Sequence, residues 1–208
     1  QNMVQLYYPF EEEVRKMKKV LLGVFCLAAL LVIARAQDKD QEKAMMAKVI
    51  EAGSPGEAQA RLKGLEGAWK AETKMWMKPG DKAATSSGTS QFSWILAGRF
   101  LKQDFVGDWA GQKFEGLGYL GYDNVRKEYV NTWMDSMSTS LATSTGQFDE
   151  ASAAIKEEGS FSCPMTGDKN KWFRSVWKIG GKDSHTYEMY TKDEKDKEFK
   201  SMEIIYKR

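Results

Sequence analysis

The feature that most constrains this chain is a succession of short strand-like segments that fills its last two thirds. From Trp69 onward about ten such segments follow at intervals of 10–15 residues, separated by turn residues such as Asp123-Asn124 and Gly180-Gly181. No helical pattern interrupts them, and short strands joined by tight turns pair in antiparallel fashion. The predicted strands are 68–77, 87–97, 99–107, 112–122, 127–136, 139–148, 152–162, 171–179, 184–191 and 198–207.

Several of these segments alternate between apolar and polar residues, as strands with one buried face do. Phe92, Trp94 and Leu96 share a face in this way. Glycines concentrated in residues 116–121 fit the bends and bulges that close a sheet on itself. The pattern therefore predicts an all-β fold, an antiparallel up-and-down β-barrel of about ten strands over residues 65–208.

A short helical segment is expected to lead into the barrel. The stretch "DQEKAMMAKVIEAG", residues 40–53, has the apolar spacing of a helix that ends at Gly53. In the "SPGE" that follows, Ser54 is expected to cap a second helix, with Glu57 completing a capping box. Residues 37–64 are therefore predicted to be this helical N-terminal segment.

Residues 17–36 are predicted to be an export signal. Two lysines precede an uncharged apolar run over residues 20–33, and Ala34-Arg35-Ala36 fits the small-residue rule of a cleavage site. The run is shorter than the roughly 20 residues of a membrane-spanning helix, although an uncleaved anchor is the alternative. Residues 1–16 carry three acids and are interpreted as an upstream extension. We expect a periplasmic or extracellular protein that meets the membrane only through its signal before cleavage.

Charge and cysteine content exclude several kinds of protein. Five of the 31 basic and three of the 29 acidic residues precede residue 37, which leaves 26 of each sign. A neutral body lacks the concentrated basic face that nucleic acids require, so no nucleic-acid partner is expected. After signal cleavage Cys163 is the single cysteine, so no intramolecular disulfide is expected. The hydrophobic core must therefore stabilise the fold without one.

A helix followed by Gly-x-Trp and then a meander resembles the lipocalin and fatty-acid-binding barrels. That resemblance implies that Trp69 packs across the closed end, beneath the helix over 55–63. Three blocks, "FSWILAGRFLKQDFVGD" (92–108), "FEGLGYLGYDNVRKEYVNTWMDSM" (114–137) and "TYEMYTKDEKDKEFKSMEIIYKR" (186–208), are similar to the DUF1579 family over residues 55–208. This resemblance implies a calycin-like barrel in an uncharacterised bacterial protein, and it carries no activity with it.

The single histidine, His185, limits the catalytic and metal chemistry that the chain can support. A triad hydrolase would need it as the base, and no Gly-x-Ser-x-Gly motif is present. A zinc site usually needs several His or Cys ligands. No cofactor is expected. The minor alternative is haem, because nitrobindin-like barrels of related shape bind haem through one histidine. His185 is instead expected at the surface or the rim, beside a turn.

The segment "NTWMDSM" offers a candidate ligand site. Trp133, Asp135 and Met137 alternate onto one face, with Tyr129 before them. If that face is interior, Asp135 is a carboxylate beside aromatic walls, and a buried carboxylate requires a partner or a raised pKa. Its candidate partners are Arg99, Arg126 and Arg174.

Glu188 and Glu203 lie among apolar residues of the last two strands, where acids are unexpected. Methionines such as Met202 are suited to line an adaptable cavity. The predicted ligand-binding residues are Arg99, Tyr129, Trp133, Asp135, Met137, Glu188 and Met202.

The function favoured by these residues is binding of a small, largely apolar molecule inside the barrel, with interior polar groups holding one end of it. The first alternative is a structural or protein-interaction barrel with a filled interior. The second is an enzyme that acts on a small lipid-like or aromatic substrate through Asp135 or Glu188.

Overall fold

The computed structural model describes the backbone of residues 8–208 and the side chains of residues 12–19, 21 and 38–208. The chain divides into two compact units, Gln1–Ala52 and Gly53–Arg208. Helix α1 (Tyr8–Ala52) belongs to the first unit and spans the predicted signal segment. Most side chains of its apolar run, and the start of the predicted extension over residues 1–16, lie outside the described residues. Within the described part of the chain, no helix meets the length and hydropathy required to cross a membrane.

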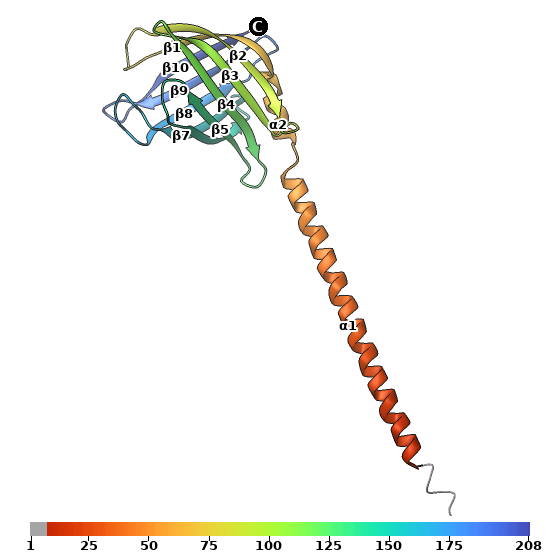
Figure 1. The fold of residues 1–208 in the computed structure, drawn as a ribbon. Helices are drawn as coiled ribbons and strands as arrows, with labels where there is room; N and C mark the ends of the chain where they lie inside the picture. Colours follow the sequence, from red (N-terminus) through yellow and green to blue (C-terminus); the bar gives the residue numbers. More distant parts are fainter. Residues whose placement is uncertain (1–7) are drawn as a thin grey trace, which may run out of the picture. The chain divides into compact units, whose positions relative to one another are not determined.

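The second unit is a closed antiparallel barrel of ten strands, which confirms the predicted fold (Figure 1). Each strand pairs with its neighbours in the sequence, and the pairing of β1 with β10 closes the barrel. The strands are β1 (Gly67–Met75), β2 (Ala84–Ile95), β3 (Phe100–Trp109), β4 (Gln112–Asp123), β5 (Glu128–Asp135), β6 (Ala142–Asp149), β7 (Ala154–Phe161), β8 (Lys171–Lys178), β9 (Ser184–Lys192) and β10 (Glu198–Lys207).

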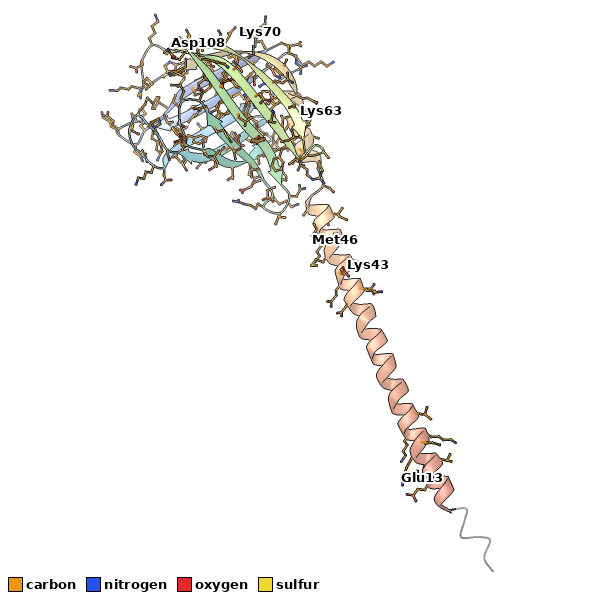
Figure 2. All side chains as sticks on the ribbon, in the orientation of Figure 1. Glu13, Lys43, Met46, Lys63, Lys70 and Asp108 are labelled. Atoms are coloured by element: carbon orange, nitrogen blue, oxygen red, sulfur yellow. The ribbon has the colours of Figure 1, made fainter. Side chains whose placement is uncertain are left out.

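The strand pairing and the burial pattern together identify the interior face. In β1, Trp69 and Ala71 are buried, whereas Lys70 and Glu72 are exposed. Figure 2 shows Lys70 projecting from the outside of the barrel. Because residues in register across neighbouring strands share a face, this alternation and the pairing assign the inward positions of the other strands, with a shift of register between Lys200 and Met202 on β10. The remaining positions point to the outer face of the barrel.

Helix α2 (Glu57–Arg61) and the 3₁₀ helix η1 (Leu62–Leu65) close one end of the barrel. Leu62 and Leu65 are completely buried. Gln59 donates a hydrogen bond to the backbone carbonyl of Tyr122, at 3.2 Å. We call this the closed end. The opposite end, formed by the loops 76–83, 110–111, 136–141, 162–170 and 193–197, is called the open end.

The cap of α2 differs from the predicted one. The helix begins after Gly56 rather than after Ser54, and the backbone N–H of Gly56 donates to the side chain of Gln59 at 2.8 Å. The predicted cap, Ser54, and the predicted capping-box residue, Glu57, are therefore both wrong: each lies two residues before the residue that takes that position. The reciprocal contact of a capping box is made by the residue at the third helical position, which here is Gln59.

Trp69 lies beneath α2 and η1, which together are called the plug, as the resemblance to the lipocalin and fatty-acid-binding barrels implied. Its indole Nε1 donates a hydrogen bond to the carbonyl of Leu65 at 2.7 Å, and the side chain is 2% exposed. The guanidinium of Arg208 lies 4.3 Å from the centre of the indole ring. Trp69 thus joins the first strand, the plug and the end of the chain.

Candidate functional site

The barrel interior changes in polarity from one end to the other. Next to the plug it is aromatic and apolar, with Trp69, Phe92 and Trp177 buried. Near the strand middles it is polar, and toward the open end it is again aromatic. Burying polar groups between two apolar layers costs free energy unless they are hydrogen-bonded. The polar layer is therefore the part of the interior that packing alone does not explain.

The centre of the polar layer is Glu157 on β7, an inward-facing carboxylate that is only 2% exposed. Its Oε2 accepts hydrogen bonds from Ser175 at 3.1 Å, Ser144 at 3.2 Å and Asn131 at 3.3 Å. These three donors come from β8, β6 and β5, so four adjacent strands converge on one oxygen. Burial raises the pKa of the Glu157 carboxyl, and the three hydrogen bonds oppose that rise.

A second polar group lies on strands β2, β3 and β10. The side-chain amide of Gln103 donates to the hydroxyl of Ser90 at 3.0 Å and to the phenol oxygen of Tyr206 at 3.1 Å. All three residues are buried. These neutral groups satisfy one another and add no charge to the interior.

The layer at the open end is built around Trp133. Its ring stacks on Phe114 at 6.5 Å between centroids and meets Phe105 edge-on at 6.4 Å. The indole lies flat against β4 because that strand has glycine there: a Cβ on Gly116 would lie 2.3 Å from the ring. Trp133 Nε1 donates to Asp135 Oδ2 at 2.9 Å. An aromatic wall and a carboxylate thus lie side by side at the open end, which is also called the mouth of the barrel.

Several inward-facing side chains retain accessible surface. Trp133, Met189 and Met202 near the open end are half-buried, and so is Asn131 deeper in the barrel. Tyr187 on β9 also keeps some accessible surface, although burial raises the pKa of its phenol. A barrel of ten strands is wider than one of eight, which side chains nearly fill.

The predicted binding residues separate into two groups. Trp133, Asp135 and Met202 face the interior near the open end, and Met137 lies on the adjoining loop, 50% exposed. The backbone N–H of Met137 donates to Asp135 Oδ1 at 3.0 Å. Strands β5 and β10 are five places apart in the closed order, so Trp133 and Met202 lie on opposite walls.

The other three predicted residues lie elsewhere. Tyr129 is buried at the closed end and donates its hydroxyl to the Ala58 carbonyl at 3.0 Å. Arg99 is exposed in the turn before β3 and donates to the carbonyl of Leu96. Glu188 faces outward from β9, where Lys178 pairs with it at 2.9 Å.

Asp135 does not receive an arginine partner. Its hydrogen bonds come from the indole of Trp133 and the backbone of Met137. Arg126 pairs with Glu128, and Arg174 pairs with Glu198, both on the outside of the barrel. Since Glu188 is on the outer face, it does not converge with Asp135 on one substrate.

His185 is buried rather than placed at the rim, so the expectation of a surface histidine was wrong. It lies at the closed end, stacked on Tyr206 and edge-on to Trp69, each at 4.3 Å between centroids. Phe92 and Trp177 lie within 6.2 Å of it. Rings on several sides leave the imidazole 3% exposed, and this does not fit axial ligation of a haem. In the described part of the chain, no group of three or more His, Cys, Asp or Glu could hold a metal ion.

Glu157 was absent from the predicted site, although the sequence contained a signal for it. In "AIKEEGSF" the residue shares parity with Ile155 and Phe161, two large apolar residues on the same strand. That parity marks it as the inward-facing one of two adjacent glutamates. Glu158 faces outward and is exposed.

Comparison with known proteins supports the fold. Among solved structures, the chain is similar to Rv2717c from M. tuberculosis, with a TM-score of 0.55 and 14% sequence identity. The similarity covers 74% of this chain and 99% of that one, and at this identity it concerns the fold alone. Comparison with curated proteins gives no match. A family model described as "Protein of unknown function (DUF1579)" matches residues 54–208, and the chain therefore belongs to the DUF1579 family.

Proposed function

We propose that the barrel binds a small, largely apolar molecule that enters through the open end. The observation that carries this proposal is the polar layer around Glu157, enclosed between two apolar layers and bordered by side chains that remain accessible. A cavity with mostly apolar walls and a few convergent polar groups is typical of small-molecule sites. Trp133 and Met202 supply walls for the apolar part of the ligand, and Asp135 lies at the entrance.

Native mass spectrometry of the purified, never-denatured protein tests this proposal. We expect a reproducible extra mass that is lost on gentle activation and that identifies the size of the ligand. A bare polypeptide mass, together with no uptake of small apolar probes from solution, would instead support a filled, structural barrel.

Replacing Trp133 by alanine is expected to weaken ligand uptake more than it weakens folding. The indole forms one wall of the mouth, but it is half-buried, so its loss removes more contact with a ligand than with the core. Uptake of an environment-sensitive apolar dye and urea unfolding, measured on the same preparation, separate the two effects. Trp172→Ala is the matched control, because Trp172 has the outward parity of β8. Equal dye affinity in Trp133→Ala and the parent would remove Trp133 from the site.

Export is a further part of the proposal, and it rests on the signal-like residues 17–36. Expression of the chain in a bacterial host is expected to give a mature protein that begins at Gln37, after cleavage behind Ala36. N-terminal sequencing of the exported fraction measures this. Retention of residues 17–36 on membrane-associated protein would support the uncleaved anchor instead.

A further inference from the structure

We propose that the ligand carries a cationic amine or amidine at its inner end and that Glu157 is the counter-ion. This inference rests on the proposed binding function and specifies the ligand's chemical class.

Acidic side chains outnumber basic ones at the inward positions of the described strands. Two carboxylates face inward, Asp135 and Glu157. Among the inward positions of the ten described strands, the one lysine or arginine is Lys171, at the open-end edge of β8. His185 does not supply a positive charge, because burial and the nearby guanidinium of Arg208 lower the pKa of its imidazole to about 3. A cationic ligand would therefore supply the positive countercharge that the protein itself does not provide near Glu157.

The geometry at Glu157 leaves one carboxylate oxygen for a ligand. The donors Ser144, Ser175 and Asn131 all reach Oε2, so no hydrogen bond from a described residue occupies Oε1. Asn131 and Tyr187, which flank the carboxylate, retain accessible surface. The three donors fix the orientation of the carboxylate, but as neutral groups they do not cancel its charge.

A buried carboxylate without a cation is costly, and a cation removes that cost. Ammonium and amidinium groups form charge-assisted hydrogen bonds that are roughly twice as strong as neutral ones. A fatty acid or another anion would be repelled by these interior carboxylates when they are ionised. The arrangement is thus the reverse of a barrel that anchors a carboxylate ligand with arginine.

The burial of Glu157 determines whether protons are released when an amine binds. Since burial raises the pKa of this carboxyl, the empty barrel favours its neutral form more than water does. When an ammonium ligand binds to a protonated Glu157, the carboxyl proton leaves to solvent and the ligand keeps its own. Amine binding is therefore expected to release protons and to tighten as the pH rises toward neutrality.

Isothermal titration of the purified protein with n-octylamine, 1-octanol and sodium octanoate tests the inference. These three probes share a chain length and differ in head group. We expect octylamine to bind at least tenfold more tightly than octanol, and octanoate to bind more weakly than either. Titration in two buffers of different ionisation enthalpy measures the released protons.

Glu157→Gln is expected to abolish the preference for octylamine while octanol still binds. The matched control is Glu158→Gln, which removes the same charge from the outer face of the same strand and should keep the preference. Circular dichroism and urea unfolding verify that both variants are folded. Asp135→Asn tests the carboxylate at the mouth and should lower octylamine affinity less than Glu157→Gln does.

The failures of the two proposals are distinguishable. Octylamine binding no tighter than octanol, or a preference that survives in Glu157→Gln, overturns the assignment of Glu157 while octanol binding preserves the binding function. A preference lost in Asp135→Asn but kept in Glu157→Gln also overturns it. Absence of binding by all three probes contradicts the binding function itself, and the inference with it.

Discussion

Replacing Trp69 by alanine is expected to lower the free energy of unfolding by about 3–5 kcal/mol, the cost of deleting a core aromatic side chain. The indole is buried at the closed end, edge-on to His185 and covered by the guanidinium of Arg208. The resulting cavity would lie between β1 and the plug, where Leu65 is completely buried. Urea unfolding followed by circular dichroism measures the change.

Trp69→Phe separates the packing of the ring from its hydrogen bond. Phenylalanine keeps most of the apolar contact but removes Nε1, which donates to the Leu65 carbonyl. Leaving that carbonyl without its donor is expected to cost about 1–3 kcal/mol. Trp69→Phe should therefore lie between the parent and Trp69→Ala. A near-neutral effect of Trp69→Ala would contradict the placement of this residue in the closed end.

The fold could be predicted because its signal is local and repeated. All ten strands lie within a few residues of the predicted segments, since turn residues mark both ends of each one. Helical capping was less predictable, because Ser54 and Gly56 are both acceptable caps. The choice between them depends on Gln59, whose side chain also reaches the Tyr122 carbonyl. That contact joins two segments far apart in the sequence.

The candidate site could be predicted only in part, because alternation shows which residues share a face but not which face is interior. Asp135 has the parity of Tyr129 and Trp133, so its inward position followed once that face was chosen. Glu188 was ambiguous, since Tyr187 and Tyr190 put aromatic rings on both faces of β9. Strand register resolves the choice: Tyr187 and the buried Trp177 lie opposite each other, which leaves Glu188 outside.

His185 shows a different limit of sequence reasoning. A histidine next to the turn before β9 was expected to be at the rim, but that turn lies at the end that η1 covers. The aromatic rings around it come from β1, β2, β8 and β10, which are brought together only when the barrel closes. The adjacent residues do not reveal such an environment.

The burial of His185 predicts a loss of stability in mild acid. Burial, and secondarily the charge of Arg208, lower the pKa of the imidazole to about 3 in the folded protein. In the unfolded chain the imidazole has its ordinary pKa near 6.5. Below that pH the unfolded chain therefore binds a proton that the folded protein does not bind. The stabilising contribution is complete above pH 6.5 and is lost as the pH falls toward 3, by up to about 1.4 kcal/mol per pH unit.

The variant His185→Phe isolates this contribution, because the chain contains a single histidine. Phenylalanine keeps an aromatic ring between Trp69 and Tyr206 but cannot take up a proton. The difference in unfolding free energy between the parent and the variant is expected to change steeply between pH 6.5 and pH 5. Contributions from carboxyl groups, including the opposite one from Glu157, cancel in that difference. Parallel profiles over this range, measured by urea unfolding, would show that the imidazole titrates as readily folded as unfolded. A positive charge could then form inside the barrel, and the interior would no longer need a cation from its ligand.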